Sequence, residues 1–211
     1  MSRKKIVITT LLIAGISFGS FAQQKKGDVE FGLNIGINQS TITNSIETAD
    51  RRIGANLAGS LEYYFSNKWG IKTKLIFDQK GWNNGYLIDY NTGDEYVSHF
   101  RLNYITIPVM ANWHFGKTGN WYLNFGPYFG FLSSATAITQ TEGDIDVKEL
   151  FESNDFGISY GIGVKIPVNN KIKFFIEVEG QGGFSELAKD GDEGITNSRG
   201  AINIGINFLM K

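Results

Sequence analysis

Hydrophobic residues alternate with small or polar ones along most of the chain, and the alternation is clearest near its middle. One row of alternate residues runs from Ile105 to Phe115 and continues, after a short polar turn, from Trp121 to Phe131. Because successive side chains on a strand point to opposite faces, this pattern predicts a two-faced β-hairpin. A turn centred on Thr118 places Phe115 opposite Trp121, so that apolar residues face apolar residues across the hairpin.

The same alternation recurs in segments separated by turn-forming residues. The predicted strands span residues 29–38, 53–65, 69–80, 101–115, 121–132, 155–167, 172–184 and 199–210. Short connections (66–68, 116–120 and 168–171) alternate with long polar ones (38–52, 81–98, 133–154 and 185–198). Transmembrane strands need about 9 to 11 residues, and bacterial outer-membrane barrels have an even strand number, short periplasmic turns and long extracellular loops. The pattern therefore predicts an all-β, closed, eight-stranded antiparallel transmembrane β-barrel with both termini in the periplasm.

Side-chain volume indicates which face of each strand points outward. In the segment 155–167 the bulky row includes Phe156, Ile158 and Ile162, and the opposite row includes Gly157 and Gly161. The interior of an eight-stranded barrel is barely wide enough for side chains, so the small row fits inside and the bulky row does not. The second row also carries too few charges for the outer wall of a soluble barrel. We therefore expect outer-membrane lipid to cover the apolar face.

Aromatic residues of the apolar row gather at the two ends of the predicted strands, as in the girdles of membrane barrels. A β-sandwich core is the alternative, but it would not sort aromatic residues by rim. The predicted girdle residues are Tyr63, Phe65, Trp69, Trp113, Phe115, Trp121, Phe129, Phe131, Phe156 and Phe208.

The N-terminal residues are typical of a secretory signal peptide. Basic residues from Arg3 precede an apolar run from Ile6 to Phe18, and Ala22 precedes the expected cleavage point. The run is shorter than the roughly 20 residues of a transmembrane helix. We expect residues 1–22 to be the signal peptide and 23–211 the barrel domain. The sequence has no cysteine, so neither a disulfide nor a lipid-attachment cysteine is expected.

The charge composition argues against one class of function, nucleic-acid binding. The chain has 20 basic and 21 acidic residues, 26 glycines and 3 prolines. A nucleic-acid partner is not expected, because no basic stripe is present to neutralise phosphates.

Two short motifs resemble a known family. Tyr104-Ile105-Thr106-Ile107-Pro108 and Gly126-Pro127-Tyr128-Phe129-Gly130 resemble the Y-L-E-I-P and G-P-Y-x-G signatures of the PorT-like outer-membrane β-barrel family, which is common in the Bacteroidota. The resemblance covers the mature chain and implies the fold and the membrane, but not a mechanism. The sequence departs from the family pattern at Thr106, where the family often has an acidic residue. The motif residues carried over are Tyr104, Pro108, Gly126, Pro127, Tyr128 and Gly130.

Charged residues in the inward row form the main candidate for a functional site. Isolated charges in a confined space are costly, so these groups should pair across the lumen. In the interpretation that we favour, the paired charges have a structural role and plug the lumen. In the functional alternative, they line a narrow pore. A turn centred on Asn67 predicts Glu62 opposite Lys72, and we expect Lys165 opposite Lys173. The predicted lumen charge network is Glu62, Lys72, Lys74, Asp78, Lys165, Lys173, Glu177 and Glu179.

Signals for a metal, a cofactor or catalysis are weak. The acidic clusters around Asp144 and Asp190 lack the spacing of an EF-hand loop. His99 follows Ser98 directly, and adjacent residues on a strand point apart, so they are not expected to form a catalytic pair. His114 points into the predicted lumen, where a structural role is expected. We expect no metal, cofactor or catalytic residue. The segment 148–151 is predicted to form a helical turn over the barrel mouth.

The sequence favours a structural or surface-binding role for the extracellular loops, with an extracellular ligand as partner. The alternatives are a narrow pore, a lipid-modifying enzyme that uses His99, and an accessory subunit of a secretion machine. The last predicts a periplasmic protein partner at the short-turn rim, near Lys68, Lys117 and Lys171.

Overall fold

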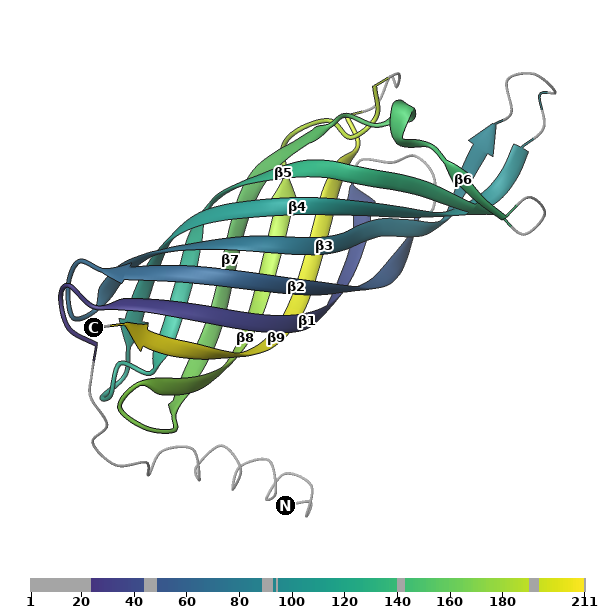
Figure 1. Cartoon of the computed structure of the whole chain (residues 1–211). Coiled ribbons are helices and arrows are strands. Elements are labelled where there is room, and N and C mark those ends of the chain that lie inside the picture. The colour runs from purple at the N-terminus through teal and green to yellow at the C-terminus, as the bar shows by residue number, and fades with distance from the viewer. Residues whose placement is uncertain are drawn as a thin grey trace, which may run out of the picture.

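The computed structural model describes residues 24–43, 49–88, 93, 95–139, 143–189 and 194–210. The predicted signal peptide, residues 1–22, lies outside the described residues. Eight strands close into an antiparallel ring in the order β1-β2-β3-β4-β5-β7-β8-β9, and β9 pairs with β1 (Figure 1). The short strand β6 pairs with the end of β5 outside this ring. The elements are β1 (Val29–Thr43), β2 (Asp50–Tyr64), β3 (Trp69–Ile88), β4 (Glu95–Phe115), β5 (Trp121–Thr139), β6 (Gly143–Asp146), the 3-10 helix η1 (Lys148–Leu150), β7 (Asn154–Pro167), β8 (Ile172–Gly183) and β9 (Thr196–Met210).

The central hairpin has the predicted register, with Phe115 opposite Trp121. Glu62 lies opposite Lys72, which is also as predicted. The register predicted for β7 and β8 is wrong by two residues, because Lys165 pairs with Phe175 and not with Lys173.

The turn between β7 and β8 explains this shift. The side-chain oxygen of Asn169 accepts hydrogen bonds from the backbone N–H groups of Lys171 and Ile172 at 2.8 and 2.9 Å. These bonds fold the connection around Asn170, one residue later than predicted. A one-residue displacement of a hairpin centre moves every cross-strand partner by two residues.

The two faces of the wall separate as predicted. Outward side chains near the middle of the barrel are apolar and exposed, for example Ile35 at 59% and Ile37 at 67%. Most inward side chains are small or polar, although Ile76, Met110 and Phe175 are also buried on this side. A Cβ atom at Gly163 would lie 2.3 Å from the Tyr122 ring, and one at Gly205 would lie 2.6 Å from the Phe175 ring. These glycines therefore make room in the lumen for large neighbours.

The strands that form the extracellular end are longer than predicted. β3 and β4 contain 20 and 21 residues, and β5 contains 19. The predictions of long loops over 81–98 and 133–154 are therefore wrong for most of their length. The alternation is interrupted at a register shift between Trp82 and Gly85, so the pattern breaks although the strands continue. In Figure 1 these strands project beyond the rest of the ring.

Apolar side chains fill the extracellular end of the lumen. Trp82 of β3 stacks on Phe100 of β4 with 4.6 Å between ring centroids, and Phe151 meets Trp82 edge-on at 5.9 Å. Phe151 follows η1 directly, so the helical turn predicted over the mouth is present. The described residues contain no helix with the length and apolar character that crossing a bilayer requires. We call this group the mouth cluster: Trp82, Phe100, Leu102, Tyr104, Leu132, Ala135, Ala137, Val147, Phe151 and Leu187.

Candidate functional site

The lumen below the mouth cluster is occupied by charged side chains in three tiers. The periplasmic tier consists of Glu30, Glu62, Lys165 and Lys173. The Lys165 ammonium donates to Glu30 Oε2 at 2.5 Å and to Glu62 Oε2 at 2.8 Å. Lys173 donates to the other oxygen of Glu30. Two carboxylates thus neutralise two ammonium groups, and Glu30 bridges the two lysines that were predicted to face each other.

Neutral polar groups complete the periplasmic tier. The Tyr64 hydroxyl donates to Glu30 Oε2 at 3.0 Å, and the Asn112 amide donates to Glu62 Oε1 at 2.7 Å. His114 lies 2.7 Å from Glu62 through Nε2 and 3.2 Å from the Gly119 carbonyl oxygen through Nδ1. His114 is thus held between two fixed partners, the arrangement expected of a structural histidine.

The middle tier consists of Lys72, Lys74, Asp78, Glu177, Glu179 and Arg199. Lys72 donates to Glu177 at 2.9 Å, and Lys74 bridges Glu177 and Glu179. Arg199 donates to Glu179 at 2.7 Å and to Asp78 at 3.0 Å. Three cations and three carboxylates form one chain of ion pairs that links β3, β8 and β9.

The outer tier is a single ion pair between aromatic rings. Lys80 donates to Asp155 at 3.0 Å, and its ammonium lies 5.0 and 4.8 Å from the ring centroids of Tyr104 and Tyr128. Cations over aromatic faces are stabilised, more strongly where water is excluded. The Tyr128 hydroxyl also donates to Asp155 at 3.0 Å.

Each tier therefore holds equal numbers of carboxylates and cations, and all their side chains are buried. All eight residues of the predicted network lie in the lumen, in the periplasmic and middle tiers. Buried charges are tolerated where they are paired and hydrogen-bonded. Sequence reasoning missed Glu30, Asp155 and Arg199 as partners. All three residues belong to the inward rows, and this position was the sequence feature from which they could have been predicted.

The motif residues lie together near the outer tier. Tyr104, Pro108, Tyr128 and Gly130 are buried on the lumen side, whereas Pro127 is exposed. Pro108 is paired with Tyr128 across β4 and β5. A Cβ atom at Gly126 would lie 2.1 Å from the Val109 carbonyl oxygen, so the neighbouring backbone leaves no space for a side chain there.

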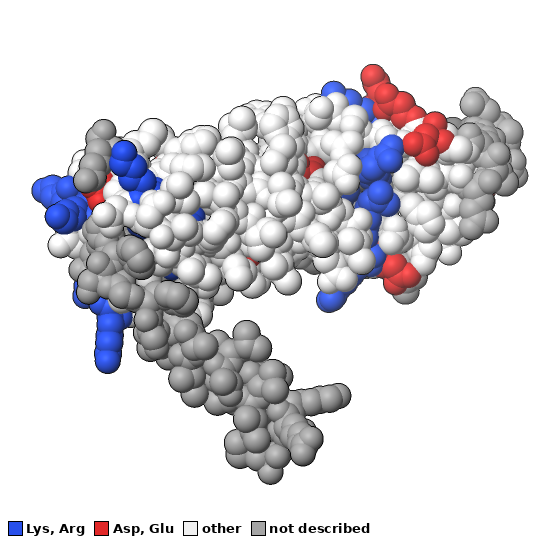
Figure 2. Space-filling view, turned by 60° about the horizontal axis from the view of Figure 1, so that its bottom comes forward, with Lys and Arg blue, Asp and Glu red and all other residues white. Residues whose placement is uncertain are grey.

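The predicted girdle residues lie on the outer wall, all exposed except Phe115, which is half-buried. Trp69, Trp113 and Phe115 form a stacked row at the short-turn end, with ring centroids 6.1 and 5.1 Å apart. Figure 2 shows Lys, Arg, Asp and Glu gathered toward the two ends of the barrel, with a nearly uncharged wall between them. That distribution matches the apolar band of a membrane barrel.

Only part of the two extracellular acidic clusters lies within the described residues. Glu142, Asp190, Asp192 and Glu193 lie outside the described residues, and Asp144 pairs with Arg101 at 3.1 Å. Within the described ranges, no three His, Cys, Asp or Glu side chains converge as metal ligands.

His99 and Ser98 have separate partners. The Ser98 hydroxyl donates to the Tyr96 carbonyl oxygen at 3.2 Å, and the Asn84 backbone N–H lies 3.4 Å from His99 Nδ1. The structure therefore does not join the two side chains.

Comparison with solved structures shows the same fold in outer-membrane proteins. OprG from Pseudomonas aeruginosa is 12% identical, with 90% of this chain and 99% of OprG covered and a TM-score of 0.53. Neisserial surface protein A is 12% identical, with 84% and 96% covered and a TM-score of 0.50. Ail, the attachment invasion locus protein of Yersinia pestis, is 17% identical, with 88% and 99% covered and a TM-score of 0.46. At such identities the likeness to OprG and to Neisserial surface protein A concerns the fold alone, and the match to Ail, with its lower TM-score, carries no argument.

Sequence comparison gives the family. No curated protein matches the chain significantly. The family model described as outer membrane protein beta-barrel domain matches residues 21–189, most of the chain. Together with the closed ring of β-strands and the apolar wall, this match shows that the chain belongs to the outer membrane protein beta-barrel domain family and is a protein of the bacterial outer membrane.

Proposed function

We propose that the protein is a non-conducting barrel that binds a macromolecule at the cell surface through its extracellular end. The filled lumen supports the first half of this proposal. Paired charges occupy three successive levels, and the mouth cluster packs above them at the extracellular end. A transport path would require these buried ion pairs to separate, and breaking a buried pair is strongly unfavourable.

The proposed surface binding is supported by one feature, which we call the outer arm. The outer arm consists of residues 84–88 of β3 and 95–97 of β4. Pairing of β3 with β2 ends at Asn83, and pairing of β4 with β5 ends at Ser98. The two strands of the arm pair with each other. Addition of a partner strand to a projecting β-ribbon is a common mode of protein recognition.

The arm also presents an apolar surface beyond the membrane. Tyr86 and Val97 are cross-strand neighbours, and they are 48% and 53% exposed. On the opposite face, Leu87 packs against the mouth cluster and anchors the arm. An exposed aromatic residue on an anchored support is typical of a binding surface, because tyrosine contributes strongly to protein interfaces.

A second candidate is a PorT-like accessory role in secretion, which the motifs around Tyr104 and Tyr128 support by resemblance. Its structural support is a basic rim at the short-turn end. Lys25, Lys68 and Lys171 are exposed there, and the backbone N–H of Lys26 donates to the Asn67 side chain at 3.2 Å. A negatively charged periplasmic partner would fit this rim.

One complementation experiment separates the two candidates. A strain without the chromosomal copy receives the wild type, an arm variant with residues 84–97 replaced by Asn-Gly, or a rim variant with Lys68→Ser, Lys117→Ser and Lys171→Ser. The deletion phenotype is scored for surface adhesion, envelope permeability and protein secretion. We expect the arm variant to reproduce the deletion phenotype and the rim variant to behave as wild type. The reverse result would reject surface binding and favour the secretion role.

A further inference from the structure

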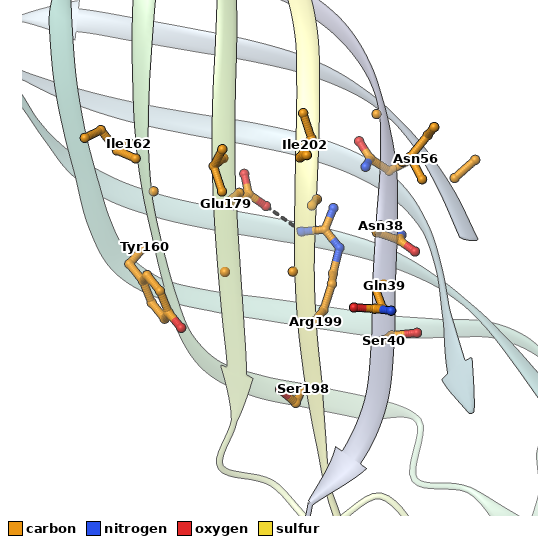
Figure 3. A pocket seen from close by; sticks show the side chains of 18 of the residues that line it. Asn38, Gln39, Ser40, Asn56, Tyr160, Ile162, Glu179, Ser198, Arg199 and Ile202 are labelled. Carbon is orange, nitrogen blue, oxygen red and sulfur yellow. Dashed lines mark hydrogen bonds and ion pairs between the residues drawn. The ribbon is translucent and has the colours of Figure 1, made fainter. Parts of the chain in front are cut away.

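A groove of about 1500 Å³ runs along the outer wall and is lined by residues of β2, β1, β9, β8, β7 and β5 (Figure 3). Ligand pockets for drug-sized molecules are typically about 300 to 1,000 Å³, so this groove has room for a larger ligand. Its outward lining is mostly aliphatic, and includes Ile37, Ile53, Val178 and Ile202.

Where the groove crosses β8 and β9, glycines leave the wall without side chains. Gly180 and Gly200 are cross-strand partners. The Tyr160 ring lies over Gly180, where a Cβ atom would come within 2.7 Å of it. At Gly200, in contrast, a Cβ atom would meet nothing within 4 Å, so the groove is open there. Tyr160 and Ile37, 56% and 67% exposed, project on either side.

A cation lies at the extracellular end of this apolar groove. Arg51 is exposed and lines the groove, two residues beyond Ile53 on β2. Its guanidinium donates to Gln39 Oε1 at 3.3 Å, and Gln39 is the β1 partner of Gly200. Among the described residues, no carboxylate lies within ion-pair distance of Arg51. Most of its five N–H donors therefore remain available to an anion.

An apolar groove in the bilayer with a free guanidinium at its outer end fits an amphiphile with an anionic headgroup. We propose that the groove binds one phosphorylated, multi-chain lipid of the outer leaflet, with its acyl chains over Gly200 and its phosphate at Arg51. The outer leaflet faces the side to which the long strands project, and Arg51 lies at that end of β2. This proposal rests on the membrane location and the orientation of the barrel, and not on the function proposed for the outer arm.

Native mass spectrometry of the purified barrel tests the proposal, with diphosphoryl lipid A and phosphatidylethanolamine as probes. Wild type should retain one lipid A per barrel in preference to phosphatidylethanolamine. Arg51→Gln removes the phosphate contact, and Gly200→Leu fills the open groove. Each change should weaken lipid A retention by about tenfold or more. Arg51→Gln removes a charge-assisted hydrogen bond, and Gly200→Leu occupies the space proposed for the acyl chains.

Two matched variants serve as controls. Gly59→Leu makes the same change on the outward face of β2, where a Cβ atom has its nearest neighbour at 4.0 Å and the groove is absent. Lys148→Gln removes an exposed extracellular charge away from the groove. Both should retain lipid A as wild type does, and all four variants should keep the heat-dependent gel mobility of a folded barrel.

Three results would overturn the proposal. The first is equal retention of lipid A and phosphatidylethanolamine by wild type. The second is an equal loss in the control variants. The third is a two-chain species that Gly200→Leu abolishes, which would assign the groove to a second copy of the chain.

Discussion

The Lys165 ammonium lies 2.8 Å from Glu62 Oε2 in the lumen, although the two residues are 103 positions apart. They stand on β7 and β2, which are not neighbours in the ring. This ion pair therefore crosses the barrel and ties opposite walls together. Both side chains are buried, and Glu62 also bonds to Asn112 and His114.

Glu62→Gln should destabilise the barrel by about 3 to 5 kcal/mol, because it leaves the Lys165 charge incompletely paired in the lumen. Urea unfolding in lipid vesicles measures this loss. Glu149→Gln, which changes an exposed residue of η1, should leave the free energy of unfolding unchanged within about 0.5 kcal/mol. Equal stability of the Glu62 variant and wild type would show that the periplasmic tier is not a structural element.

A lysine introduced on the outer wall should be costly in proportion to its depth in the membrane. Ile35 lies near the middle of β1 and faces outward, so Ile35→Lys should cost about 2 to 4 kcal/mol. Val168 lies in the turn between β7 and β8, so Val168→Lys should cost about 1 kcal/mol or less. Equal costs in vesicle unfolding would contradict the assignment of the apolar face to lipid.

Two glycines should respond differently to the same small change. A Cβ atom at Gly126 would lie 2.1 Å from the Val109 carbonyl oxygen, whereas one at Gly182 meets nothing within 4 Å. Gly126→Ala should therefore lower the unfolding free energy by about 1 to 3 kcal/mol through overpacking, and Gly182→Ala should change it little. If Gly126→Ala folds with wild-type stability, close backbone approach does not explain this motif glycine.

The mouth cluster should shield Trp82 from water. In a variant whose other tryptophans, Trp69, Trp113 and Trp121, are replaced by Phe, acrylamide should quench Trp82 fluorescence weakly, because this side chain is 5% exposed. Phe151→Ala removes the ring that meets Trp82 edge-on, so quenching should increase. Strong quenching before this change would mean that water reaches the lumen from outside.

The barrel architecture follows from sequence wherever lipid contact imposes strict alternation. The hairpin register at Phe115 and Trp121 was predictable because both faces of the hairpin carry a clear pattern. Alternation is weak where strands leave the membrane, as in the Asn83-Asn84-Gly85 segment, because the side chains there no longer face lipid. The extracellular extensions of β3 and β4 were therefore assigned to loops, and Trp82 and Phe100 were not recognised as inward residues.

The sequence predicted which charged residues lie in the lumen, but it did not predict which of them pair with one another. Inward rows identified Lys165, Lys173 and Glu177 as lumen residues. Their partners depend on which strands face each other across the closed ring, and on the vertical stagger between them. Neither quantity is encoded in the spacing along one strand. Glu30 illustrates this, because it bridges Lys165 and Lys173 from β1.

Single-channel recording in a planar bilayer tests the central claim, a lumen closed by paired charges and by the mouth cluster. Residues 23–211, without the predicted signal peptide, are inserted, and insertion is verified by the mobility shift between heated and unheated samples. We predict no discrete current steps from inserted wild-type protein. Reproducible steps, with a cation or anion preference altered by Glu177→Gln and Glu179→Gln, would show that the tiers line an open path and would contradict the account.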